Sequence, residues 1–498
     1  MTYVSGQTSL IVDGKPLTAY SEDEFRPTWI VRTSDMQRVP GTDATDGYCT
    51  LSYSWNYSGD LIKGEDDEYE CIDNEVKFEQ LLQQLCKDFN IEYIWYDKMC
   101  IDQNNKVAKH TEIENMHQIY RSAAYSVAMI PEMAIPESVE SFHEREVIEK
   151  CLIDICQSQW FKRMWTLEEA IMSNHIVFVG RNAHLWNAAR IFFGAGFFLS
   201  VPMGHVEDLF ELFTNSTPSA NVALRQAHVR VTTKEHDRAY ALANVFADII
   251  EVKVNYDIPA LSAISNFYSD LIENDLSVLC FGKSRYDYNS TLREYYDLPS
   301  WTGIHGCHFR SNAKLVHPDD IKKYILVDRH EEDTIEGKIP NHRLQINNCN
   351  YVSVTPRQFP LAEETLSRFV SDGGLEFTHY INELSSDKPD HEDMKREMVD
   401  KTIAPRRKNP ITFLSLIEEC DECLVLDFSF EWNDGSSTRI YPVIRKVEQN
   451  EEEEEQEPTY RSIGVLLVRC RIYYLQRQSS LSDFMENEDM QNGSFVIV

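Results

Sequence analysis

The chain has 498 residues, 42% of them hydrophobic, which is too long for one hydrophobic core and predicts two or three domains. Its 48 Lys and Arg against 81 Asp and Glu give a net charge of −33, which argues against general binding to nucleic acids or anionic membranes. No segment resembles a signal peptide, and the longest apolar stretch, 189–203, is too short to span a bilayer. These features predict a cytoplasmic protein with no membrane and no nucleic-acid partner.

Strand and helix patterns alternate between residues 48 and 180, after a leader of short strands and turns. The expected strands are 49–53, 91–96, 125–130 and 176–179, and the expected helices are 78–89, 113–123, 147–156 and 165–172. This alternation predicts right-handed crossovers and a parallel sheet covered by helices on both faces. Ligands of such sheets bind beyond the carboxyl ends of the strands, so the loops after Tyr53, Asp97 and Ile130 are expected to share one edge.

The remaining chain is predicted to form two further regions. Residues 191–335 are expected to be mainly helical, and residues 336–498 to form an α+β region. In the second of these, the strand patterns 424–432 and 439–444 predict a hairpin, and 463–474 predicts a further strand. Residues 448–457 hold seven glutamates and predict a solvated acidic loop.

Three short segments carry a family resemblance. They read Y-C-T-L-S-Y-S-W at 48–55, W-Y-D-K-M-C-I-D-Q at 95–103 and R-M-W-T-L-E-E at 163–169. In this order and spacing they resemble the Y-x-A-L-S-Y-x-W-G, W-I-D-x-x-C-I-N-Q and R-x-W-T-x-Q-E boxes of the HET (heterokaryon incompatibility) domain of filamentous fungi. The chain has Asn56 where the family usually has glycine, and later segments extend the likeness to about residue 301.

The resemblance implies a flavodoxin-like, TIR-related α/β domain over residues 1–190. It also implies a role in fungal non-self recognition and regulated cell death, with output triggered by self-association; it does not identify protein partners. Some TIR domains cleave NAD+ with a glutamate four residues after a tryptophan, and Trp165 and Glu169 stand at that spacing here. NAD+ would then be a substrate, and no cofactor or metal is expected.

The chemistry of that reaction suits a carboxylate. Positions i and i+4 of a helix share one face, so Trp165 is expected to wall a pocket into which Glu169 points. Breaking the nicotinamide–ribose bond builds positive charge on the sugar, which a nearby carboxylate stabilises. The other expected ligand-binding residues follow the first two strands, and they are Ser52, Tyr53, Trp55, Asn56, Asp97 and Asp102.

A second interpretation treats the domain as a non-catalytic protein-interaction scaffold in which Glu169 is a structural carboxylate. An open pocket around Glu169 beside Ser52, Tyr53 and Asp97 would favour the enzyme, whereas burial of Glu169 in an ion pair or its exposure to bulk solvent would count against the enzyme. Glu168, usually glutamine in the family, is expected to face solvent. The alternative role of Trp55 and Trp165 is packing in the hydrophobic core. The alternative role of Asp97 is to cap the turn or helix that follows it.

Overall fold

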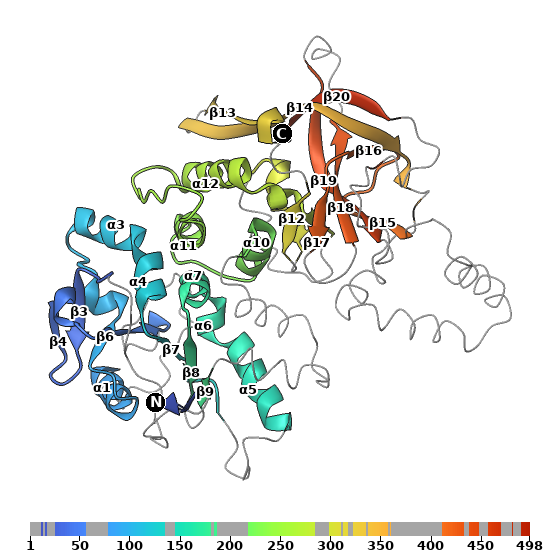
Figure 1. The fold of residues 1–498 in the computed structure, drawn as a ribbon. Helices are drawn as coiled ribbons and strands as arrows, with labels where there is room; N and C mark the ends of the chain where they lie inside the picture. The colour runs from blue at the N-terminus through green and yellow to red at the C-terminus, as the bar shows by residue number, and fades with distance from the viewer. Residues whose placement is uncertain are drawn as a thin grey trace. The chain divides into compact units, whose positions relative to one another are not determined.

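The fold was analysed in a computed structural model of the chain. The structure describes residues 11–12, 15–16, 25–55, 78–134, 145–180, 184–186, 218–283, 298–309, 312–316, 322–334, 337–356, 359, 411–432, 438–447, 457–469, 481 and 490–498. The chain forms two compact units (Figure 1): unit 1 comprises Met1–Pro218 and Val229–Phe267, and unit 2 comprises Ser219–His228 and Tyr268–Val498. The division into three regions at residues 190 and 335 stays a prediction.

Unit 1 is built on a seven-stranded sheet. Its strands are β3 (Trp29–Arg32), β4 (Gln37–Pro40), β5 (Cys49–Ser52), β6 (Tyr93–Trp95), β7 (Ser126–Met129), β8 (Ile176–Val179) and β9 (His184–Trp186), in the order β4-β3-β6-β5-β7-β8-β9. The four strands from β6 to β8 in this order are parallel, and they confirm the four predicted strands. The sheet is nevertheless mixed, because β3, β4 and β9 add antiparallel strands at its edges.

The strands at the centre of the sheet are buried. All four residues of β5, β7 and β8 are buried, as expected for parallel strands between two helical layers. The polar residues among them are paired across strands: Thr50 Oγ1 and Ser126 Oγ are 2.5 Å apart in the register Thr50↔Ser126. Taken in chain order, the parallel strands follow the spatial sequence 2-1-3-4, which places a change of direction between β5 and β7.

Unit 1 also contains helices. They are α1 (Phe78–Asp88), α2 (Asp97–Cys100), α3 (Lys106–Glu114), α4 (Met116–Ser122), α5 (Arg145–Gln157), α6 (Gln159–Lys162), α7 (Trp165–Met172) and α11 (Asp237–Val245). The helix predicted at 113–123 is confirmed over Met116–Ser122, but residue 113 belongs to the preceding helix, because the backbone leaves the helical region at Asn115 (ψ 2°) between α3 and α4. Helix α11 packs against α7.

Unit 2 is rich in β-structure. Helices α10 (Ala220–His228) and α12 (Ala260–Asn274, which begins in unit 1) lie in the region predicted to be mainly helical. Strands enter that region at β10 (Phe281–Gly282), which pairs with β11 (Cys307–His308). The main sheet has the order β12-β17-β18-β16-β14-β20-β19-β15, and its strands β18 and β19 also pair with each other. Five strands from β18 to β19 therefore close into a barrel-like ring.

The strands of this sheet confirm the predicted hairpin. They are β12 (Ala313–Leu315), β13 (Ile325–Thr334, paired with β14), β14 (Gly337–Val354), β15 (Ile411–Leu416), β16 (Cys423–Leu426), β17 (Phe430–Trp432), β18 (Thr438–Lys446), β19 (Thr459–Arg469) and β20 (Gln491–Ile497). Strands β17 and β18 pair antiparallel, with Phe430 opposite Ile440. Within the described residues of 337–498 no α-helix is found; residues 360–410, 448–456 and 189–203 lie outside them.

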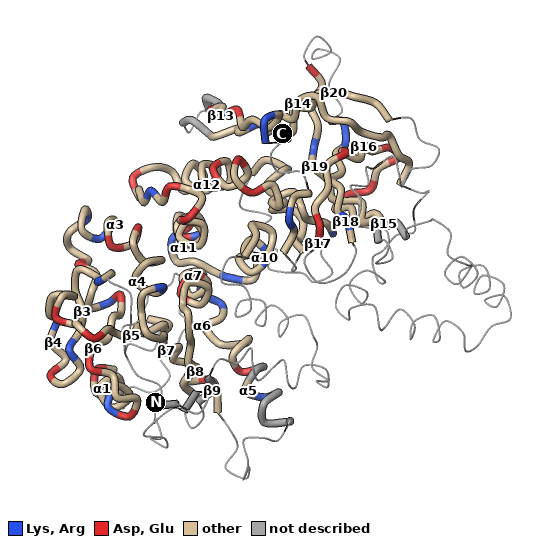
Figure 2. The backbone as a smooth tube through the Cα atoms, in the orientation of Figure 1, with Lys and Arg blue, Asp and Glu red and all other residues tan. Residues whose placement is uncertain are grey.

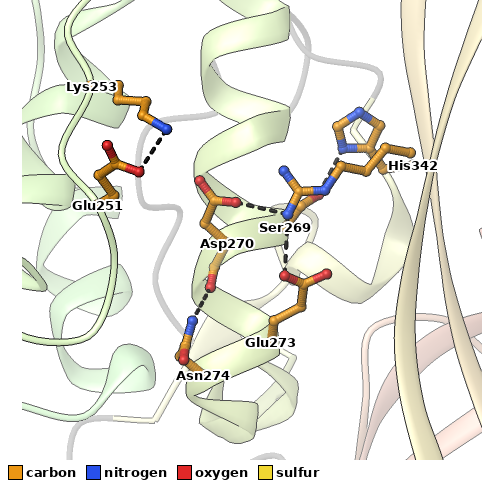
Figure 3. A network of polar contacts seen from close by, with 8 residues as sticks. Glu251, Lys253, Ser269, Asp270, Glu273, Asn274 and His342 are labelled. Carbon is orange, nitrogen blue, oxygen red and sulfur yellow. Dashed lines mark hydrogen bonds and ion pairs between the residues drawn. The ribbon is translucent and has the colours of Figure 1, made fainter.

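A polar network links α12 to the β13–β14 hairpin (Figure 3). The Arg329 guanidinium of β13 donates to Asp270 Oδ1 at 2.7 Å and to Glu273 Oε2 at 3.2 Å. The Ser269 hydroxyl and His342 Nδ1 are 2.7 Å apart, and both side chains are buried. Since both residues are enclosed by the protein, this pair serves packing within unit 2.

Asp and Glu residues occur in both units, with Lys and Arg residues among them (Figure 2). In the described part of the chain, no helix has the length and apolar character needed to cross a membrane. Among the same residues, no group of three or more His, Cys, Asp or Glu side chains is placed to hold a metal ion.

Candidate functional site

A buried hydrogen-bonded chain lies where β5 ends. Ser52 is the last residue of this strand, and its hydroxyl donates to Glu169 Oε2 of α7. The hydroxyl oxygen of Ser52 in turn accepts the indole N–H of Trp160 at 2.6 Å. A serine hydroxyl has one proton. Because Ser52 acts as the acceptor toward Trp160, it donates this proton to the Glu169 carboxylate. Ser52 and Trp160 together fix the position of Glu169.

Glu169 is poised between its two protonation states. Burial raises its pKa to about 7, while the nearby Arg163 charge and the Ser52 hydrogen bond keep the pKa from rising further. The side chain is 4% exposed, which excludes the interpretation in which it faces bulk solvent. A carboxyl group with such a pKa is present in both forms near neutral pH, as acid–base groups of enzymes often are.

The loops after β5 and β6 are tied together beside this pair. Asp97 follows β6 as the first residue of α2, and its Oδ2 accepts the Trp55 indole N–H at 2.6 Å. Its other oxygen accepts the backbone N–H of Lys98 at 2.7 Å, so Asp97 also stabilises the start of the turn. Arg163 donates to the backbone carbonyl of Tyr53 at 2.5 Å. Burial, followed by the Asp97 charge, raises the pKa of Tyr53 well above its usual range.

The sequence around these residues is similar to a known family. Residues 48–169 match the family model described as Heterokaryon incompatibility protein (HET). The chain carries a HET domain. Comparison with curated proteins and comparison with solved structures gave no match. Ser52, Asp97 and Glu169 lie inside the matched range, and Glu169 is its last residue.

For two predicted site residues of the HET domain, Trp165 and Asp102, the contacts found are with residues other than Ser52 and Glu169, and a third site residue is not described. The half-buried Trp165 bonds to the Asp237 carboxylate, which also accepts the Tyr256 hydroxyl at 2.7 Å. Asp102 accepts the backbone N–H of Asn104 at 3.0 Å and so stabilises a local turn. Asn56 lies outside the described residues.

Trp160 was missed by the sequence analysis, which assigned the pocket wall to Trp165. The indole N–H of Trp160 could have pointed to it, because a buried tryptophan needs a hydrogen-bond acceptor for this group. Arg230, which is 0% exposed, was also missed, since it lies beyond the three boxes of the HET domain. Its Nη1 donates to the Arg163 carbonyl and to Thr166 Oγ1, both at 2.9 Å, and its guanidinium lies 4.7 Å from the Phe161 ring centroid.

Glu168 does not face solvent, and that prediction is wrong. Its side chain is 0% exposed, and among the described residues neither carboxyl oxygen has a hydrogen-bond partner. Burial and the neighbouring Glu169 charge raise its pKa well above the usual range. The reason lies in the packing of α7, because α4 and α11 contact this helix and every residue from Thr166 to Met172 is buried.

Proposed function

We propose that this protein acts in fungal non-self recognition and regulated cell death, and that its HET domain cleaves NAD+ at the Ser52–Glu169 pair. One observation carries the proposal: Ser52 at the end of β5 donates a hydrogen bond to Glu169 on α7 at the carboxyl edge of the parallel strands, and the charge of Asp97, just after β6, acts on the same carboxyl group. The strand order changes direction between β5 and β7, the place where doubly wound sheets bind ligands. A TIR-related fold and activation by self-association belong to the same proposal.

In this mechanism the bond between nicotinamide and ribose breaks and its electron pair leaves with nicotinamide. Ionised Glu169 stabilises the positive charge that develops on the ribose, and water adds to the sugar carbon and releases a proton. Ser52 holds the carboxylate in place through its hydrogen bond. A preorganised group of this kind contributes about 3–4 kcal/mol to the stability of a transition state.

A non-catalytic scaffold is the second candidate function. It is favoured by the burial of Glu169, which is 4% exposed and already accepts a hydrogen bond within the protein. In that case the carboxyl group stabilises the junction of β5 and α7, and the HET domain acts through protein contacts alone.

Incubation of the whole chain with NAD+ separates the two functions. Nicotinamide release is measured with and without a crowding agent that promotes assembly, for the wild type and for Glu169→Gln. Glu168→Gln is the matched control, because it changes the adjacent carboxyl group to the residue usual in the family. Release by wild type and Glu168→Gln but not by Glu169→Gln supports the enzyme. Equal release by all three removes Glu169 from the mechanism, and no release in any condition favours the scaffold.

A further inference from the structure

Two cysteines of unit 2 stand three residues apart where the chain passes from β15 to β16. Cys420 lies in this connection, and Cys423 is the first residue of β16. In an extended chain their Cα atoms would be about 10 Å apart, whereas a disulfide spans at most about 7 Å. The backbone bends at Asp421, between the two cysteines, and the two thiols form a hydrogen bond with each other. The bend therefore brings the two sulfur atoms together.

Contacts that do not involve the thiols hold this connection from two sides. The guanidinium of Arg445, on β18, donates to the backbone carbonyl of Glu419 at 3.4 Å and lies 3.6 Å from the carboxylate of Glu418. On the other side, the hydroxyl of Ser353, on β14, donates to the carboxylate of Glu422. Strands β14 and β18 are the two neighbours of β16 in the sheet. The position of the thiol pair is thus set by the strands around it.

The two thiols differ in their access to solvent. Cys423 is 1% exposed and belongs to the hydrophobic core between the strands, whereas Cys420 is half-buried and packs against the same core. A reagent from solvent therefore reaches Cys420 first. Burial raises the pKa of the Cys420 thiol, while the hydrogen bond from Cys423 and the Arg445 charge act to lower it. Burial also raises the pKa of Cys423, so the fold does not stabilise the ionised, reduced pair, and this favours a disulfide at equilibrium.

We propose that Cys420 and Cys423 form a reversible disulfide by exchange with oxidised glutathione. The Cys420 thiolate attacks one sulfur of glutathione disulfide, whose S–S bond breaks, and the electron pair leaves with the first glutathione. Cys423 then loses its proton to solvent, attacks the Cys420 sulfur of the mixed disulfide and releases the second glutathione. In total the two cysteines lose two electrons and two protons, and glutathione disulfide is reduced to two glutathione thiols.

This modification site is independent of the proposed function, because both cysteines lie outside the matched range 48–169. The disulfide would join the connection to the start of β16, where Cys423 lies opposite Val354 of β14. A cross-link of this kind restricts the unfolded chain and so stabilises the folded one. The stability of unit 2 would then depend on the ratio of oxidised to reduced glutathione around the protein.

Peptide mapping of the whole chain tests the proposal. The protein is incubated with oxidised glutathione, quenched with acid, alkylated with N-ethylmaleimide in denaturant and cleaved after glutamate residues. Cleavage after Glu422 places the two cysteines in different peptides, so their disulfide appears in mass spectrometry as a linked pair. The test variants are Cys420→Ser and Cys423→Ser. Cys349→Ser is the matched control, because Cys349 is another partly buried free thiol of unit 2.

The wild type is expected to lose both alkylation sites together, to give the linked peptides, and to regain both sites in excess reduced glutathione. Cys423→Ser should stop at the mixed disulfide between glutathione and Cys420. Cys420→Ser should leave Cys423 reduced, because this thiol is buried, and Cys349→Ser should behave as the wild type does. Urea unfolding should show that oxidation moves the transition of unit 2 to a higher urea concentration in the wild type but not in Cys420→Ser.

The wild type alone can overturn the proposal, whether or not the variants fold. Alkylation of both cysteines at every ratio of oxidised to reduced glutathione would do so, as would a mixed disulfide on Cys420 that Cys423 does not displace. A bond from Cys420 to any other cysteine would have the same meaning. Zinc found by elemental analysis in the isolated wild type, and absent from Cys420→Ser, would replace the disulfide by a metal site and also overturn the proposal.

Discussion

Replacing Glu169 by glutamine is expected to change how the stability of unit 1 depends on pH. The pKa of Glu169 is about 7 in the fold against a model value of 4.5. A raised pKa means that the folded protein holds this proton more tightly than the unfolded chain does. The stability from the neutral carboxyl group is therefore fully present below pH 4.5 and is lost as the pH rises toward and through 7.

The size of the effect follows from the shift. One pKa unit corresponds to about 1.4 kcal/mol, so the Glu169 contribution to the free energy of unfolding should fall by about 2–3 kcal/mol between pH 5 and pH 8. The side chain is 4% exposed, so solvent screening reduces this value little. Glutamine does not titrate, and the variant should lack this part of the pH dependence.

Urea unfolding at pH 5, 6, 7 and 8 measures the difference, with the transition of unit 1 compared between wild type and Glu169→Gln. Ser52→Ala is a useful second variant, because losing the hydrogen bond that lowers the Glu169 pKa should move the loss of stability to higher pH. A difference between wild type and Glu169→Gln that stays constant from pH 5 to pH 8 would refute the reasoning, since a group that is ionised throughout this range gives a constant difference.

Three further predictions follow from buried groups. If ionised Glu169 is the catalytic form, nicotinamide release should rise with pH and reach half its plateau near pH 7; a flat profile from pH 6 to pH 8 would contradict this. Glu168→Met removes a buried carboxyl group without partners among the described residues and should raise the free energy of unfolding in urea by about 1–3 kcal/mol, so a loss of stability would count against the described packing. In unit 2, burial lowers the pKa of His308 to about 3, so stability present above pH 6.5 should fall by about 2 kcal/mol from pH 7 to pH 5. His308→Phe should show no such fall in urea unfolding, and an unchanged slope would assign it to other groups.

Much of the sheet in unit 1 was predictable, because its strands are short apolar runs separated by amphipathic helices. Residues 176–179 were predicted as a strand and form β8 with the same bounds. The antiparallel strands β3, β4 and β9 were not assigned to this sheet. Strand β3 pairs with β6, which lies far along the chain, and such pairing leaves no local periodicity; β4 and β9 are short strands that pair with their chain neighbours β3 and β8. The break between α3 and α4 at Asn115 was not predicted. The helical spacing of apolar residues continues across Asn115, so the sequence pattern gives no sign of the backbone angle that ends α3 there.

The candidate site was predicted in part. Ser52 and Asp97 were predicted as site residues because they lie at the ends of predicted strands. Glu169 was predicted because it stands four residues after Trp165 on a predicted helix. The environment of Glu168 was not predictable from α7 alone, because its exposure depends on coverage by α11, which comes 65 residues later in the chain. For the same reason Arg230 and Asp237, which meet α7 from the later segment, were absent from the expected site.

The interleaving of the two units has a consequence for fragments of this protein. Unit 1 takes up residues 229–267 after the chain has contributed Ser219–His228 to unit 2. A fragment ending at Glu169 or near residue 190 would contain the whole family match yet lose the segment that packs on α7. Such a fragment would leave the apolar side of that helix uncovered and Asp237 missing from Trp165, so it should aggregate or be cut by proteases where the whole chain resists. We therefore expect the smallest fragment of this HET domain that folds by itself to be longer than the matched range 48–169.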